Sequence, residues 1–158
     1  MWYNGIKENR CMGYEYAVSA CLCGKNVRYD GKSKVLSKWK ELYDQGKVLL
    51  ICPEVQGGLS IPREPSEMVG DKIMSRIGVD VTHNFKSGAQ EALRMIQEHP
   101  SIHTIILKEN SPSCGLHYVY DGTFSGTKIE GMGVFARVAI EHGYKVYNEV
   151  EAEDIVIG

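Results

Sequence analysis

The chain has 158 residues and a formal charge of −2, with 43% apolar and 24% charged side chains. This composition is typical of a soluble globular protein, and the length suits one domain with a real core. The balanced charge provides no basic surface for nucleic acid, and no apolar run approaches the roughly 18 residues that cross a membrane. We therefore expect neither a nucleic acid nor a membrane as the primary partner.

The chain carries five cysteines, an odd number, and its first residues lack the apolar core of a secretory signal. We expect a cytoplasmic protein, where thiols stay reduced, so the cysteines indicate metal binding or catalysis. Residues 1–14 are polar and without periodicity, which predicts a loosely ordered N-terminal extension ahead of a single domain over residues 15–158. A monomer or a small homo-oligomer is expected.

Apolar patterning predicts strands and helices in alternation. Continuous apolar runs predict strands buried in a parallel sheet over residues 16–20, 47–52 and 101–108. Apolar side chains at helical spacing predict helices over residues 34–46, 82–99 and 134–142, before a last short strand over 145–147. The alternation predicts an α/β fold, a three-layer α/β/α sandwich with a mostly parallel, Rossmann-like sheet.

Three stretches fall outside this alternation. Residues 53–70 are rich in proline and glycine, which predicts a long ordered loop and excludes a helix or a central strand. Residues 72–82 predict a small hairpin that turns at Gly78, and Thr82 is expected to N-cap the next helix. Residues 107–133 are glycine-rich and lead into a helix, which offers a weak phosphate-binding alternative. The glycines that carry this alternative are Gly122, Gly126, Gly131 and Gly133.

Three cysteines stand where three predicted strands end. Cys21 follows the first strand, Cys52 ends the second, and Cys114 lies a few residues beyond the third. Ligands of open parallel sheets bind outside the carboxyl ends of the strands, so we expect these thiols to converge on one site. A free cysteine is often only a small buried side chain, but three in equivalent positions favour a shared role.

Three thiolates leave one position open on a tetrahedral zinc ion or on one iron of a four-iron cluster. Structural zinc sites usually contain close C-x2-C pairs, so these scattered cysteines favour the iron–sulfur cluster. Cys11, in the N-terminal extension, is expected to take no part. Cys23 is either a spare ligand or a residue that points away from Cys21.

Polar residues near the same edge can supply acid–base chemistry. Glu54, in the Cys-Pro-Glu turn, is either a general acid/base or a loop carboxylate that accepts backbone N–H groups. Ser111 and Ser113, beside Cys114, either hydrogen-bond a ligand or form the turn. Lys108 could offset thiolate charge or bind an anion. Three further charged residues could hold an acidic or amide-bearing substrate or pair with one another: Arg28, Asp30 and Arg63.

Four motifs occur in the same order as in one known family. They are VSACLCGKNVRYDGKSK (18–34), CPEVQGGLSIPREPSEMV (52–69), DVTHNF (80–85) and LKENSPSCG…YDGTFSGTKIEGMGVFA (107–136). Over about residues 16–148 the chain resembles the family labelled domain of unknown function 523, which includes the thiouracil desulfurases. It departs from the common pattern at Cys23, where an apolar residue is usual, and in its N-terminal extension.

The resemblance implies a [4Fe-4S] cluster ligated by the single cysteines of the SAC, CPE and SPSC motifs, here Cys21, Cys52 and Cys114. It implies an enzyme that converts a thiolated uracil to uracil, the open-site iron taking the substrate sulfur. The substrate would be 2- or 4-thiouracil or a thiouridine nucleotide.

In that family the glutamate of CPE and a serine of SPSC are acid–base and substrate-positioning residues. The resemblance carries these roles to Glu54 and to Ser113, with Ser111 as the other serine of the motif. The alternative hypothesis is a non-catalytic iron–sulfur or zinc module with a structural or redox-sensing role.

Overall fold

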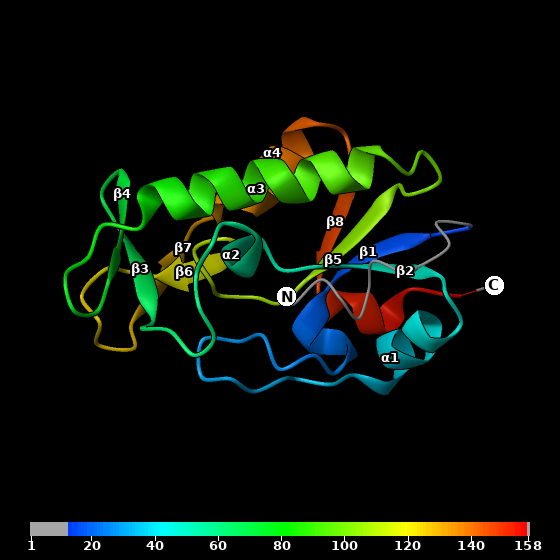
Figure 1. The fold of residues 1–158 in the computed structure, drawn as a ribbon, viewed down its shortest axis with the longest axis horizontal. Helices are drawn as coiled ribbons and strands as arrows, with labels where there is room; N and C mark the ends of the chain where they lie inside the picture. Colours follow the sequence, from blue (N-terminus) through cyan, green and yellow to red (C-terminus); the bar gives the residue numbers. More distant parts are fainter. Residues whose placement is uncertain (1–12, 158) are drawn as a thin grey trace.

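A four-stranded parallel sheet forms the centre of the computed structural model, which describes residues 13–157 (Figure 1). The strands are β1 (Tyr16–Ser19), β2 (Val48–Ile51), β5 (Thr104–Leu107) and β8 (Lys145–Asn148). Their order in the sheet is β2-β1-β5-β8, and each neighbouring pair is parallel. The predicted parallel α/β fold is therefore confirmed.

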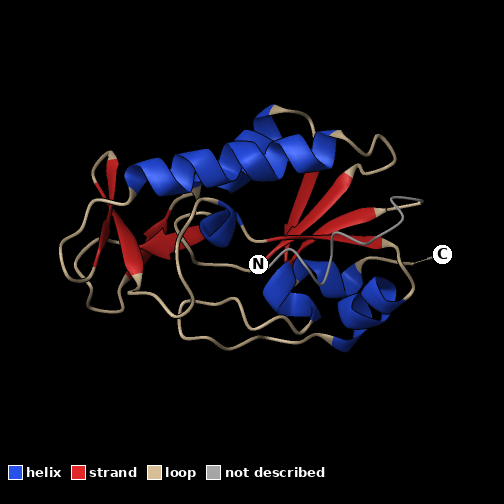
Figure 2. Ribbon diagram, viewed as in Figure 1, coloured by secondary structure: helices blue, strands red, loops and turns tan. Residues whose placement is uncertain are grey.

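Helices cover both faces of this sheet, which gives the predicted three layers (Figure 2). On one face lie α3 (Thr82–Gln97) and α4 (Val134–Glu141). On the other lie α1 (Ser37–Asp44) and two short 3-10 helices, η2 (Ala20–Cys23) and η3 (Glu151–Asp154). Within residues 13–157, none of the helices combines the length and apolar character that a membrane span requires.

Alternate side chains along each strand point to opposite faces of the sheet and pack into the two halves of the core. Ala17 packs with the α3 and α4 side, whereas its neighbour Val18 packs with the α1 side. All of β2 is buried, since both of its faces are covered. Trp39 of α1 is fully buried against the sheet, and burying a side chain of this size contributes at least about 3 kcal/mol.

The first helix begins later than its apolar pattern predicts. Residues 34–36 run extended beside η2, where the N–H of Lys34 donates to the carbonyl of Cys21 at 2.9 Å. Val35, which the pattern placed on the buried face, is 52% exposed. These backbone bonds tie the incoming loop to the segment that carries Cys21.

The prediction of no regular structure in residues 53–70 is wrong. A short helix, α2 (Pro53–Gln56), directly follows β2, because proline is tolerated in the first helical turn, where no N–H bond is needed. β3 (Ser66–Val69) then pairs with β4 (Lys72–Ser75) around Gly70. The predicted turn at Gly78 exists, but it follows β4 and sets Asp80 beside Met74 in an isolated bridge.

Two further expectations need correction. Thr82 is not the N-cap of α3 but its first residue, because its hydroxyl instead accepts the N–H of Ile73 at 2.8 Å. Asp80 accepts the N–H of Thr82 at 2.9 Å. Tyr14, assigned to the loose extension, is only 2% exposed and belongs to the core. Residues 1–12 of that extension lie outside the described residues.

A second hairpin lies within the glycine-rich stretch. β6 (Tyr118–Tyr120) and β7 (Lys128–Glu130) pair antiparallel, and the sequence pattern does not predict them. Both hairpins lie at the end of the molecule where α3 begins, β3–β4 beyond its N-terminal end and β6–β7 beneath its first turns (Figure 1). This end faces the carboxyl edge of the central sheet, so residues of the hairpins can line a site at that edge.

Backbone contact without side chains fixes α2 against α3. A β-carbon added to Gly88 would lie 1.8 Å from the carbonyl oxygen of Pro53, and one on Gly57 would lie 2.0 Å from that of Asn84. The Asn84 amide also donates to the Gly57 carbonyl at 2.9 Å. Because α2 starts directly after Cys52, this contact sets the position of that cysteine and of the residues that follow it.

The sign of the stability change in the Gly88→Ala variant tests this contact. Helix propensity alone predicts that alanine stabilises α3 by about 1 kcal/mol. The collision with Pro53 predicts the reverse, a loss of about 1–3 kcal/mol and a melting temperature lower by roughly 4–10 °C. Thermal unfolding of Gly88→Ala against the exposed control Lys86→Ala measures this, and a rise in melting temperature would contradict the close contact.

Candidate active site

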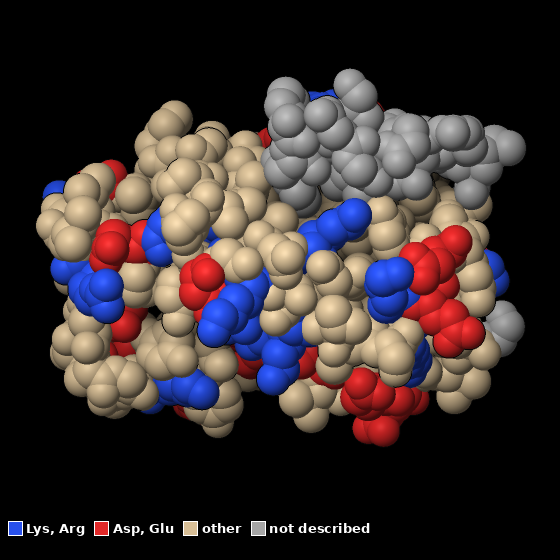
Figure 3. Space-filling model, turned by 60° about the horizontal axis from the view of Figure 1, so that its bottom comes forward, with Lys and Arg blue, Asp and Glu red and all other residues tan. Residues whose placement is uncertain are grey.

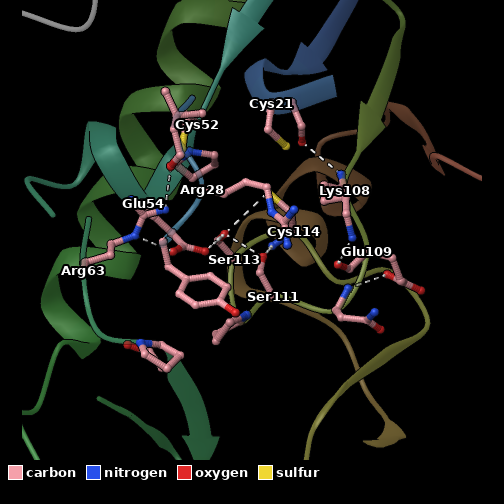
Figure 4. A pocket seen from close by; sticks show the side chains of 18 of the residues that line it. Cys21, Arg28, Cys52, Glu54, Arg63, Lys108, Glu109, Ser111, Ser113 and Cys114 are labelled. Atoms are coloured by element: carbon pink, nitrogen blue, oxygen red, sulfur yellow. Dashed lines mark hydrogen bonds and ion pairs between the residues drawn. The ribbon is translucent and has the colours of Figure 1, made fainter. Parts of the chain in front are cut away.

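A cavity of about 380 Å³ lies at the carboxyl edge of the sheet, between β1, β2 and β5 and the two hairpins (Figure 4). Its size falls within the range of roughly 300–1,000 Å³ that is usual for small-molecule sites. Cys21, Cys52 and Cys114 all line it. The strand ends therefore bring together the three thiols that the sequence selects.

Each cysteine is positioned by the element that carries it. Cys21 lies in η2, which starts where β1 ends. Cys52 is the N-cap of α2, and its N–H donates to the side chain of Gln56 at 2.9 Å. The N–H of Cys114 donates to Ser111 Oγ at 2.8 Å. Cys21 and Cys114 are each only 6% exposed and Cys52 is half-buried, so the thiols are largely shielded from bulk water.

Burial dominates the chemistry of these thiols. It raises the pKa of Cys21 to about 12, with the nearby Cys52 as the next cause. It raises the pKa of Cys52 to about 11, followed by the charge of Glu54. Burial also raises the pKa of Cys114 far above its usual range, although a hydrogen bond from Ser113 opposes the shift. The three thiols are thus neutral at pH 7 unless iron or another cation binds their thiolates.

Glu54 and the two serines form one hydrogen-bonded chain beside the thiols (Figure 4). Ser113 Oγ lies 3.0 Å from Glu54 Oε2 and 3.0 Å from Ser111 Oγ. Since Ser111 Oγ already accepts the N–H of Cys114, its own proton is available for Ser113. Ser113 can then donate to the carboxylate, which links Glu54 to the Cys114 turn.

Arg63 holds the other oxygen of Glu54. Its Nε donates to Glu54 Oε1 at 3.1 Å, and the two side chains are only 8% and 14% exposed. The remaining nitrogens donate to the carbonyls of Ser60 at 3.1 Å and Val27 at 3.0 Å. Arg63 therefore pairs with Glu54 and not with Asp30, whose carboxylate accepts the N–H of Lys32.

The start of α4 supports the SPSC turn from behind. The N–H of Val134 donates to the Pro112 carbonyl at 2.7 Å, and those of Phe135 and Ala136 donate to the Ser113 carbonyl. Gly133 is required here, because a β-carbon would lie 2.5 Å from the Ser113 carbonyl carbon. These N–H groups are occupied, so the phosphate-cradle alternative for the glycine-rich stretch is wrong.

Of the two basic residues near Cys21, one is paired. Lys108 Nζ forms an ion pair with Glu149 Oε2 at 3.1 Å. The Arg28 guanidinium points into the cavity and has no hydrogen bond or ion pair with any residue from 13 to 157 (Figure 4). On the face drawn in Figure 3, basic and acidic side chains are interspersed, in keeping with the net charge of −2.

Cys23 lies outside the cavity. Its Sγ lies 3.5 Å from the carbonyl oxygen of Trp39, in the core between η2 and α1. Of the two alternatives for this residue, the structure therefore favours the one in which it points away from Cys21. Cys11 lies outside the described residues.

The arrangement of the three cavity thiols suits a metal cluster better than a single metal ion. Within the part of the chain that the structure describes, no three His, Cys, Asp or Glu side chains are grouped closely enough to chelate a single metal ion. The cysteines surround a cavity instead of closing on one point. Soft thiolate donors around such a space fit an iron–sulfur cluster.

Comparison with known proteins agrees with this geometry. The family model for 2-thiouracil desulfurase matches residues 17–151. The chain belongs to this family. The desulfurase family match includes all three cavity cysteines, Glu54 and both serines of the SPSC turn.

Two relatives are similar over nearly the whole desulfurase region. The uncharacterized protein YbbK of Bacillus subtilis (strain 168) is 42% identical over 149 residues, which cover 88% of this chain and 98% of YbbK. A solved structure of the [4Fe-4S]-dependent thiouracil desulfidase TudS is 40% identical with a TM-score of 0.83, covering 89% of this chain and 94% of that one.

Some cavity residues are not identifiable from the sequence pattern. Glu67 and Tyr120 line the cavity from β3 and β6. Neither stands beside a cysteine or at the end of a strand of the central sheet, and the sequence predicts neither hairpin where it forms. Only the pairing of the hairpins could have identified them.

The cluster-free protein should lose stability at alkaline pH through Cys23. Burial raises the pKa of this thiol to about 12 in the folded state, so above the ordinary thiol pKa the unfolded chain ionises first. The stabilisation is present below that ordinary pKa and is lost as pH rises, by roughly 1.4 kcal/mol for each pH unit. Urea unfolding should show that the free energy of unfolding of wild type falls relative to that of Cys23→Ala between about pH 8 and about pH 10.5. A difference that stays constant with pH would contradict a buried, neutral Cys23.

Proposed function

We propose that this chain removes the sulfur of a thiolated uracil, with a [4Fe-4S] cluster held by Cys21, Cys52 and Cys114. The observation that carries this proposal is the meeting of three thiols from three strand ends with the Glu54–Ser113 pair in one cavity. Membership of the desulfurase family and the likeness to a [4Fe-4S]-dependent thiouracil desulfidase support it. The partner is accordingly a small thiolated pyrimidine.

The three thiols supply three of the four ligands that such a cluster can take. When bound, the cluster provides Lewis acidity at the iron that lacks a protein ligand, where a thiocarbonyl sulfur can bind. Because burial keeps the free thiols protonated, loading releases protons, and Lys108 and Arg28 partly oppose the effect of burial on Cys21.

The overall reaction is a hydrolysis without change of oxidation state. Water supplies the oxygen, the C=S bond breaks as the C=O bond forms, and the sulfur leaves as sulfide. We assign to Glu54 Oε2 the proton that the attacking water gives up. Ser113 and Ser111 hold this carboxylate and a substrate in register through their hydroxyls. Arg63 holds Oε1 in an ion pair, whereas Oε2 accepts only the Ser113 hydroxyl and keeps a second lone pair for the proton.

A non-catalytic cysteine-bound module is the second candidate. It would account for the three thiols and for their burial. It gives no role to a carboxylate that is held on both oxygens within a cavity of ligand size. The enzyme is therefore the better interpretation, and the two experiments below separate the candidates.

Cluster content should follow the cavity cysteines alone. Cys21→Ala, Cys52→Ala and Cys114→Ala should each lose the visible absorption and most of the iron and sulfide after anaerobic reconstitution, because each removes one of three ligands. Cys23→Ala is the matched control and should keep both, because its thiol faces Trp39. Cluster loss in Cys23→Ala, or retention in all three others, would contradict the ligand set.

Glu54→Gln should slow catalysis and leave the cluster in place. Loss of a general base typically costs roughly 10²–10⁴-fold in kcat, which uracil release from 2- and 4-thiouracil would measure. Glu98→Gln, at the exposed C-cap of α3, serves as the control and should keep full activity. Unchanged turnover of Glu54→Gln would remove the acid–base role, and absence of turnover by a loaded wild-type protein would favour the non-catalytic module.

A further inference from the structure

The positive charges that line the cavity differ in whether a carboxylate compensates them. Arg63 pairs with Glu54 at 3.1 Å, and Lys108 pairs with Glu149 at 3.1 Å. Arg28 lines the same cavity, and none of residues 13–157 gives its guanidinium a hydrogen bond or an ion pair (Figure 4). Its charge is therefore available to a ligand.

The backbone around Arg28 is fixed, although its side chain has no partner. The N–H of Arg28 donates to the Lys32 carbonyl at 3.2 Å, and the Arg28 carbonyl accepts the N–H of Gly31 at 2.9 Å. Gly31 has a φ of 75°, a conformation that glycine adopts without a steric penalty. This closed turn sets the point from which the guanidinium extends into the cavity.

Arg63 connects this turn to Glu54. Its Nη2 donates to the Val27 carbonyl at 3.0 Å, and its backbone N–H donates to the Tyr29 carbonyl at 2.8 Å. The residues on both sides of Arg28 are thus held by one arginine, which also pairs with Glu54 Oε1. Because the wall is already ordered, a ligand that binds the free guanidinium has little backbone to immobilise.

The charge of Arg28 acts at the end of the cavity that carries the thiols. Arg28 and Lys108 both oppose the larger effect of burial, which raises the pKa of Cys21. Lys108 is compensated by Glu149, so the charge of Arg28 remains for an anion near this cysteine. Hydrogen bonds between a guanidinium and an anion are roughly twice as strong as those between neutral groups.

The proposed reaction releases one anion at this end of the cavity. A neutral thiolated pyrimidine and water give neutral uracil, and the sulfur leaves as hydrosulfide, the form of sulfide that carries one proton. Of the two protons that the water supplies, one leaves on the sulfur and the other is carried away by Glu54. The balance requires no oxidant or reductant.

We propose that Arg28 is the binding residue for the released hydrosulfide, and that its guanidinium donates hydrogen bonds to this anion in the cavity before the anion escapes. This inference rests on the proposed function, which supplies the anion. A guanidinium offers five N–H donors and stays charged at any working pH, so it can hold the sulfur as the bond to carbon breaks.

Arg28→Gln and Arg28→Lys separate the charge of the side chain from its other properties. Glutamine removes the charge, whereas lysine retains it. The turn is held by backbone atoms, so the melting temperature and the iron and sulfide content after anaerobic reconstitution should remain as in wild type. Arg137→Gln, exposed on α4, is the matched control.

The test measures product inhibition of the reconstituted holoenzyme by sodium sulfide and by uracil, with 4-thiouracil as substrate. Arg28→Gln should raise the inhibition constant for sulfide by roughly tenfold or more, because it removes a hydrogen bond between charged groups. Arg28→Lys should recover most of this loss, and the inhibition constant for uracil should stay constant. Anaerobic titration of the visible spectrum with sulfide should give the same order of affinities without turnover.

The outcomes distinguish this inference from the proposed function. Unchanged sulfide inhibition in Arg28→Gln, an equal loss for sulfide and uracil, or stronger inhibition by inorganic phosphate than by sulfide overturns the role of Arg28 and leaves the desulfurase proposal standing. Failure of Arg28→Gln to load the cluster overturns it too, because the residue would then be structural. If loaded wild type releases no uracil, the desulfurase proposal fails, and the spectral titration still decides whether Arg28 binds hydrosulfide.

Discussion

The shape of the cavity depends on the Glu54 carboxylate. One oxygen pairs with Arg63 and the other with Ser113, so three segments distant in sequence share a single group: α2, the loop that leads to β3, and the SPSC turn. Removing one partner of a shielded ion pair typically costs about 3–5 kcal/mol, because the remaining charge is left without compensation. The same contacts that hold these walls together also determine which carboxylate oxygen is available to a ligand.

The layout of the fold and the cysteine site follow from short-range sequence features. Apolar runs predict the buried strands, and apolar side chains at helical spacing predict α3 and α4. Once the strands are parallel, their carboxyl ends must share one edge, and that constraint alone brings Cys21, Cys52 and Cys114 to one place. The pairing of Glu54 with Ser113 agrees with the motif resemblance, although no local pattern requires it.

The remaining features depend on contacts between distant segments. The helix α2 forms in a stretch whose proline and glycine content argues against it, because α3 offers a backbone surface without side chains at Gly88. The hairpin β6–β7 contains only short strands, one of them exposed throughout, so it lacks an apolar pattern. Glu67 acquires its place in the cavity wall from the pairing of both hairpins. No window of sequence contains that information.

The glycine contact between α2 and α3 has a consequence for how the family can diversify. Carbonyl oxygens occupy the space that a β-carbon on Gly57 or Gly88 would need. The wall that carries Cys52 and Glu54 therefore has no side chain at this contact that could vary, and no space for a new one. The hairpin wall is built from side chains, so it can be altered without disturbing the thiols. New substrate ranges should therefore arise at the hairpins, and libraries for altered selectivity are best confined there.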